Sequence, residues 1–119
     1  SNRKNENRIK RKKRIRKKIF GTDKKPRLSV SRSLNHIYAQ IIDDEKGHTL
    51  VAASTLSKEI CDTMKKKCNK TAAEKVGELL AEKAKKVNIL EVSFDRNGYI
   101  FHGRVKSFAE GCRKGGLSF

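Results

Sequence analysis

The chain has 119 residues and a formal net charge of +17 at pH 7, with 35% hydrophobic and 36% charged residues. This length predicts one domain with a tail, and the excess of positive charge predicts a polyanionic partner such as nucleic acid. No apolar run is long enough to span a membrane and no secretory signal is recognisable, which predicts a soluble, intracellular protein.

The N-terminal part of the chain is a strongly basic arm. Residues 1–27 contain fourteen Lys and Arg against two acidic residues, so they carry +12, whereas residues 28–119 carry +5. Because such dense charge repels itself, we expect the arm to stay extended or mobile until a polyanion neutralises it. The alternative is a helix with a thin apolar stripe at Ile15 and Ile19 that ends at Gly21. A localisation signal or a solubilising tail are other interpretations of the charge. We predict an arm and linker over residues 1–26 and a folded domain over residues 27–119.

Three strands are predicted between residues 27 and 55. Apolar residues recur at every second position there, which is typical of strands with one buried face, and turn-forming residues separate the three runs. Short connections of this kind predict an antiparallel meander. The predicted buried face holds Leu28, Val30, Ile37, Ala39 and Ile41, and the opposite face holds Ser29, Ser31, His36, Tyr38 and Gln40.

Helices and one further strand are predicted in the second half. Residues 57–68 are expected to form a short helix. The strongest predicted helix is capped by Asn69 or Thr71 and has an apolar stripe that extends to Val87, and Gly77 in it should allow close approach to the sheet. The apolar run 89–94 predicts a fourth strand, and the helical crossover before it favours parallel pairing. A last helix from about Arg104 should end at the glycines 115–116. The predicted fold is therefore an α/β sandwich with a mixed sheet. The apolar stripes of the two long helices are Ala73, Val76, Leu79, Leu80, Ala84 and Val87, and Val105, Phe108, Ala109 and Cys112.

Two regions of the predicted domain have the chemistry to hold nucleic acid. His36 and Tyr38 lie on the polar face of the sheet, where aromatic rings can stack on bases. The alternative is that any half-exposed sheet is polar on one side.

The Asn97-Gly98 turn and the glycine between His102 and Arg104 can bring backbone N–H groups close to a phosphate. The alternative interpretations are that Asn97-Gly98 is only a turn and that His102 has a structural role.

Catalysis and metal binding are not predicted. The acidic residues 43–45 lie together in a turn, where carboxylates are usually solvated, and Asp95 stands apart. No nucleophile–base motif appears, and the glycines match neither a dinucleotide fingerprint nor a P-loop. Cys61, Cys68 and Cys112 include no Cys-x-x-Cys pair, which is typical of reduced thiols, and we assign them no role. We expect no enzyme, no cofactor and no metal.

The order and spacing of several stretches resemble one family, the bacterial large-subunit ribosomal protein eighteen family. The resemblance covers about residues 26–119, and the basic arm agrees with it in character. The stretches that carry it are RLSVSRS at 27–33, HIYAQIIDD at 36–44, TLVAAST at 49–55, FDRNGY at 94–99, HGRV at 102–105 and the terminal GLSF.

The resemblance implies a fold and a role. It implies a three-layer α/β/α domain with a mixed sheet and a ribonuclease-H-like architecture that lacks the catalytic acids. It further implies binding to 5S ribosomal RNA, attachment of that RNA to 23S ribosomal RNA in the central protuberance, and neighbouring large-subunit proteins as partners. Neither a membrane nor a small-molecule substrate is implied. The resemblance implies that the protein is located in the cytoplasmic ribosome of a bacterium, and an organellar ribosome is the alternative.

The RNA contacts implied by the resemblance fall into three groups. The first is the arm, the second is the region of the first two strands, and the third is the loop before the last helix. Their members are Arg3, Lys4, Arg8, Lys10, Arg11, Lys12, Lys13, Arg14, Arg16, Lys17 and Lys18; Arg32, Ser33, His36, Tyr38 and Gln40; and Arg96, Asn97, Gly98, Tyr99, His102, Gly103 and Arg104.

We interpret the arm as the source of sequence-independent affinity through its contacts with phosphates, and the body as the source of selectivity for RNA shape. One alternative is a nonspecific basic nucleic-acid-binding protein, which would show no preference among structured RNAs. The other is a nuclease on the same architecture, which needs a divalent metal and converging acidic residues.

Overall fold

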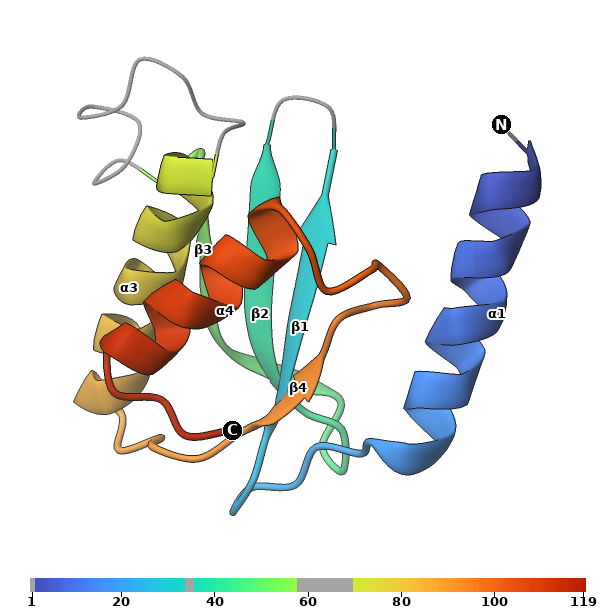
Figure 1. Ribbon diagram of the computed structural model, residues 1–119. Coiled ribbons are helices and arrows are strands. Elements are labelled where there is room, and N and C mark those ends of the chain that lie inside the picture. The colour runs from blue at the N-terminus through green and yellow to red at the C-terminus, as the bar shows by residue number, and fades with distance from the viewer. Residues whose placement is uncertain (1, 34–35, 58–69) are drawn as a thin grey trace.

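The computed structural model describes residues 2–33, 36–57 and 70–119, with side chains from residue 5 onward (Figure 1). A short helix was predicted over residues 57–68. All of it but residue 57 lies outside the described residues, as do Cys61 and Cys68. The elements in chain order are α1 (Asn2–Lys18), β1 (Arg27–Arg32), β2 (Ile37–Asp43), β3 (His48–Ser54), α3 (Lys70–Lys86), β4 (Ser93–Asp95) and α4 (Arg104–Lys114).

The four strands form one mixed sheet in the order β3-β2-β1-β4. The first three strands are the predicted antiparallel meander, in which Leu28 lies opposite Ile41 and Val30 lies opposite Ala39. Strand β4 pairs in parallel with β1, as the helical crossover predicts, and places Phe94 beside Leu28. The predicted α/β sandwich with a mixed sheet is confirmed.

The fourth strand is shorter than predicted. It spans Ser93–Asp95 rather than residues 89–94. Residues 91 and 92 pair with the C-terminal segment instead of with the sheet. Glu91 forms an isolated parallel bridge with Ser118, and the Val92 N–H donates to the Ser118 carbonyl. Hydrogen bonds to the chain end therefore replace the expected pairing in the sheet.

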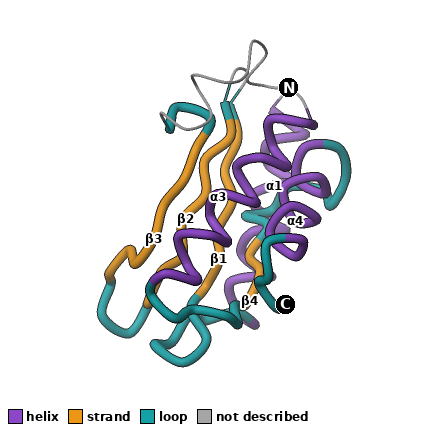
Figure 2. Tube along the Cα trace, turned by 90° about the vertical axis from the view of Figure 1, so that its left-hand side faces the viewer, coloured by secondary structure: helices purple, strands orange, loops and turns teal. Residues whose placement is uncertain are grey.

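Helices α3 and α4 lie on the same face of the sheet and form the core with it (Figures 1 and 2). The five residues predicted for the buried face are all at most 2% exposed, and the apolar stripe of α4 is buried as predicted. Cys112 is a free thiol inside this core, and burial raises its pKa above the ordinary value. Helix α3 ends at Lys86, so Val87 lies beyond it and is 55% exposed, which corrects its place in the predicted stripe.

Gly77 serves the packing of helix on helix, not of helix on sheet. A Cβ atom at Gly77 would collide with the Phe108 carbonyl oxygen of α4, and one at Gly111 would collide with the Glu74 carbonyl oxygen of α3. Two glycines therefore let the backbones of α3 and α4 touch. The prediction of a close approach was right, but its partner was wrong.

The arm is a helix, which was the alternative to an extended segment. Helix α1 lies beside the loop that follows β4 (Figure 1). Lys and Arg are good helix formers, and contacts with the body, described below, offset the repulsion among its cations. None of the described helices is long and apolar enough to cross a membrane.

Candidate nucleic-acid interface

Helix α1 carries two stripes of side chains with different surroundings. We call Arg8, Arg11, Ile15 and Arg16, which are half-buried, the inner stripe. We call Lys10, Lys13, Arg14 and Lys17, which are exposed, the outer stripe. Both sets follow the spacing of three and four residues that defines one face of a helix. Lys12 and Lys18 are also exposed, whereas the side chains of the predicted Arg3 and Lys4 lie outside the described part.

The N-terminal half of α1 is attached to the Asn97-Gly98 turn. Arg8 donates from Nη1 to the Asn97 carbonyl oxygen at 3.1 Å, and Arg11 donates from Nε to the Gly98 carbonyl oxygen at 2.9 Å. Both turn residues have positive φ, 57° and 80°, as the predicted turn requires. A Cβ atom at Gly98 would collide with the Arg8 carbonyl oxygen and lie 3.0 Å from the backbone nitrogen of Lys12. Only glycine lets the helix approach this closely.

Tyr99 connects this turn to α1 and to the end of β1. The guanidinium carbons of Arg8 and Arg32 lie 4.7 Å and 4.9 Å from the centre of its ring. Its hydroxyl donates to the Arg32 carbonyl oxygen at 3.3 Å and accepts from the Arg32 N–H at 3.4 Å. Cation–π contacts of this kind stabilise by about 0.5–2 kcal/mol. The ring predicted to meet RNA is thus engaged by the protein's own cations.

The C-terminal half of α1 is attached through Asp44. Its carboxylate accepts hydrogen bonds from Arg27 at 2.9 and 3.0 Å, from the Gly21 N–H at 2.7 Å and from Arg16 at 3.4 Å. The hydrogen bonds from Arg27 are the main reason that the pKa of Asp44 falls from 3.8 to about 2. Arg27 also binds the fully buried Asp95 at 2.8 Å.

The acidic turn is therefore not the solvated turn that the sequence predicts. Asp44 is held by arginines, and Asp43 is 1% exposed and accepts the backbone N–H groups of Glu45 and Lys46 at 3.0 and 3.3 Å. The sequence missed this network because only the sheet register brings Arg27 to Asp95. Among the described residues, no three His, Cys, Asp or Glu gather where they could hold a metal ion.

The polar face of the sheet presents the second predicted group. The rings of His36 and Tyr38 are 6.2 Å apart and tilted, and Nδ1 of His36 lies 2.9 Å from the Thr55 hydroxyl. Tyr38 is half-buried and Gln40 is exposed. Among the described residues no helix covers this face (Figure 2), and both rings are partly exposed.

The loop between β4 and α4 brings the third group next to the second. Arg104 donates to the Ser33 carbonyl oxygen at 3.2 Å, and Arg96 donates to the Tyr99 carbonyl oxygen at 2.7 Å. Gly103, with φ 58°, stands at the N-terminus of α4, and His102 is exposed beside it. The structure therefore brings the arm, the end of β1 and this loop to one side of the molecule (Figure 1).

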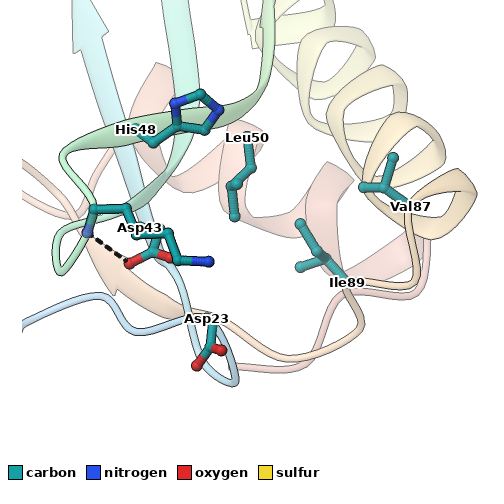
Figure 3. Close-up of a pocket in the computed structure, with 7 residues that line it drawn as sticks. Asp23, Asp43, His48, Leu50, Val87 and Ile89 are labelled. Carbon is teal, nitrogen blue, oxygen red and sulfur yellow. Dashed lines mark hydrogen bonds between the residues drawn. The ribbon is translucent and has the colours of Figure 1, made fainter.

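A pocket of about 490 Å³ contains none of the predicted RNA contacts. Figure 3 shows Leu50, Val87 and Ile89 on its apolar side, with Asp43 hydrogen-bonded within its own turn.

Comparison with known proteins gives a consistent result over nearly the whole chain. The family described as "Ribosomal L18 of archaea, bacteria, mitoch. and chloroplast" matches residues 2–119. The chain is 57% identical over 116 residues to "Large ribosomal subunit protein uL18" of Clostridioides difficile (strain 630), covering 98% of this chain and 95% of that protein. Proteins of the same name from Pseudothermotoga lettingae and Caldicellulosiruptor saccharolyticus are 57% and 56% identical; they cover 94% and 97% of this chain, and the matches span 92% and 93% of those proteins.

Proposed function

The chain belongs to the ribosomal L18 family, and on this premise we propose that it binds 5S ribosomal RNA and helps to attach it to 23S ribosomal RNA in the central protuberance. As a member of this family it is a structural constituent of the large ribosomal subunit and not an enzyme. The reported relatives are all bacterial, which places it in the cytoplasmic ribosome of a bacterium. Its partners are ribosomal RNA and neighbouring ribosomal proteins.

The observation that carries the proposal is the gathering of cations from three distant segments on one side of the molecule. Helix α1, the end of β1 and the loop before α4 are linked there by hydrogen bonds that span up to 89 residues of sequence. Exposed lysines and arginines on such a surface neutralise phosphates, and the released counterions drive binding. This side supplies affinity that does not depend on sequence.

Selectivity for 5S RNA is assigned to the body. His36, Tyr38 and Gln40 offer two rings and an amide on the open face of the sheet, which can stack on unpaired bases and reach 2′-hydroxyl groups. His102, Gly103 and Arg104 add a helix N-terminus flanked by a histidine and an arginine, a suitable place for a phosphate. We propose these residues as the contacts that distinguish one folded RNA from another.

The test compares binding to 5S ribosomal RNA with binding to a structured RNA of similar length, in a salt series from low salt to about 0.3 M. We expect the preference for 5S RNA to persist at the highest salt, because contacts with RNA shape are screened less than phosphate contacts. Equal affinities that fall together with salt would contradict the proposal and support the nonspecific nucleic-acid-binding alternative.

A further inference from the structure

We propose that Arg27 is a positioning residue for RNA binding: it fixes the point at which the basic arm leaves the body, Gly21, relative to the loop of residues 96–104. The inference deepens the proposed function and rests on it. It concerns the linker and the body only, and it requires no contact between α1 and the body. Arg27 thus determines how well the arm and the loop reach one RNA together.

Arg27 uses all three nitrogens of its guanidinium group inside the protein. Nε and Nη2 donate to the two carboxylate oxygens of Asp44 at 2.9 and 3.0 Å, and Nη1 donates to Asp95 at 2.8 Å. The Arg27 side chain is only 13% exposed, and its single positive charge lies between two carboxylates. Because this group as a whole repels a phosphate, Arg27 acts on RNA through the residues that it holds.

Asp44 carries the link to the arm. Its Oδ2 accepts the Gly21 N–H at 2.7 Å, and its backbone N–H donates to the Gly21 carbonyl oxygen at 2.9 Å. A Cβ atom at Gly21 would collide with the backbone nitrogen of Arg27 and the carbonyl oxygen of Ile42, so only glycine fits there. Two hydrogen bonds and close steric contact therefore fix Gly21 independently of the residues before it.

The linker from Gly21 to Arg27 is closed on itself. The Thr22 N–H donates to the Lys25 carbonyl oxygen at 3.1 Å, and the Lys25 N–H donates to the Thr22 hydroxyl at 3.1 Å. Both ends of this short segment meet at the carboxylate of Asp44. While Arg27 holds Asp44, the arm cannot shift its starting point by flexing the linker.

Asp95 carries the link to the loop. One of its oxygens accepts from Arg27, and the other accepts the Asn97 N–H at 2.8 Å. Asp95 is fully buried, so this end of the network is rigid. The bond between Asn97 and Asp95 does not involve Arg27, and the loop therefore keeps its turn when the arginine is replaced.

A fixed starting point for the arm has a measurable consequence for binding. Two binding segments of one chain assist each other through an effective concentration, which is highest when their separation matches the RNA. A loose starting point lowers this concentration without removing any phosphate contact. Arg27 should therefore affect RNA affinity only as far as the arm contributes to binding. A residue that acted on the stability of the fold alone would weaken binding equally with and without the charges of the arm.

The first experiment is a double-mutant cycle on the full chain. Arg27→Lys keeps a positive charge between the carboxylates, but a single ammonium group cannot reproduce the fork that holds both. It is combined with a variant of the outer stripe that carries Lys10→Gln, Lys13→Gln, Arg14→Gln and Lys17→Gln. We expect Arg27→Lys to weaken binding to 5S ribosomal RNA roughly fivefold in the wild-type background and less than about twofold in the outer-stripe background.

Val76→Ala is the matched control for stability. Val76 is fully buried on α3 and forms no part of the network around Arg27. Its truncation loosens the core, so any effect on RNA binding should be the same in the wild-type and outer-stripe backgrounds.

The second experiment needs no RNA and follows two backbone amides by hydrogen exchange in the free protein. Arg27→Lys should speed exchange at Gly21 and at Asn97, roughly tenfold at each, because one guanidinium group holds both acceptors. Asp44→Asn should speed exchange at Gly21 and leave Asn97 unchanged, since it removes only the arm side of the network. Val76→Ala should not produce either pattern.

Two results would overturn the inference. One is a cycle in which Arg27→Lys weakens binding equally in the two backgrounds or in neither, which would mean that Arg27 does not position the arm. The other is an unchanged exchange rate at Gly21 or at Asn97 in Arg27→Lys, which would mean that Arg27 does not join the linker to the loop. The failure of the proposed function is separate: the wild type would then bind both RNAs equally, while the effects on amide exchange in the free protein would remain.

Discussion

Two kinds of contact attach helices to the rest of this protein: apolar contacts attach α3 and α4, and mainly polar contacts attach α1. Helices α3 and α4 are joined to each other and to the sheet by buried apolar side chains, with Gly77 and Gly111 bringing the helix backbones into contact. Helix α1 is attached by three arginines, one carboxylate and one glycine, in a largely exposed setting. The body should therefore resist salt, whereas the position of α1 should respond to salt and to acid below about pH 4, where Asp44 loses its charge. Substitutions can break one attachment and leave the other.

The largest expected effect comes from the apolar attachment. Phe108 is fully buried and stacks on Phe94 with ring centres 6.4 Å apart. Phe108→Ala should lower the free energy of unfolding by about 3–5 kcal/mol, through lost burial and the cavity left behind. Urea denaturation measures this loss. Phe101→Ala is the control: Phe101 is 41% exposed, so its loss should be much smaller. Similar losses in the two variants would contradict the apolar character of this attachment.

The next largest effect comes from Arg27, which links the two attachments. Arg27→Met leaves Asp95, which is fully buried, without its ion-pair partner and removes the main hydrogen bonds to Asp44. Breaking a buried pair on one side costs about 3–5 kcal/mol, and we expect roughly the lower figure because Asp44 keeps contact with Arg16. Restoring stability with Asp95→Asn in the Arg27→Met background would identify the unpaired carboxylate as the cause. Failure of this rescue would point to lost packing instead.

The third effect depends on pH. The pKa of Asp44 is about 2 in the folded protein and ordinarily 3.8, because Arg27 hydrogen-bonds the charged form. A lowered folded pKa stabilises the fold above the unfolded value, and this contribution disappears as pH falls from about 4 to 2. Urea denaturation across this range should show a steeper loss for the wild type than for Asp44→Asn. Glu45→Gln is the control, because within the described residues the exposed Glu45 side chain has no hydrogen bond or ion pair. If the free energy of unfolding fell equally steeply with pH in the wild type and in Asp44→Asn, the role of Asp44 would be contradicted.

The sequence predicted the apolar attachment far better than the polar one. Alternation along β1 and β2 and the stripe of α4 are local patterns, so they identified the core without knowledge of the fold. The Asn97-Gly98 turn was equally local. The bonds from Arg8 and Arg11 span 89 and 87 residues, and no spacing in the sequence announces them. Charge repulsion within the arm was visible, but the acceptors that offset it were not.

The limits of the polar prediction are instructive at two further places. Arg27 was absent from the predicted site residues, although it connects Asp44 and Asp95, because its role follows from the register of β1 with β4. Gly77 was predicted to approach the sheet, since a helix pattern alone does not say which neighbour a small residue faces. Local patterns identify elements, and tertiary contacts choose their partners.

The smallest expected effect separates the two kinds of contact made by Tyr99. Tyr99→Phe removes the hydroxyl bonded to the backbone of Arg32 and keeps the ring beneath the guanidinium groups of Arg8 and Arg32. We expect a loss of about 0.5–1.5 kcal/mol in the free energy of unfolding, the usual contribution of one hydrogen bond, with the helical signal of α1 retained. Tyr99→Leu removes the ring's π face as well and should also lower that signal, because Arg8 loses its cation–π partner. Circular dichroism and urea denaturation of both variants make the comparison. If Tyr99→Phe lost as much helical signal as Tyr99→Leu, the hydroxyl and not the ring would be what links α1 to the end of β1.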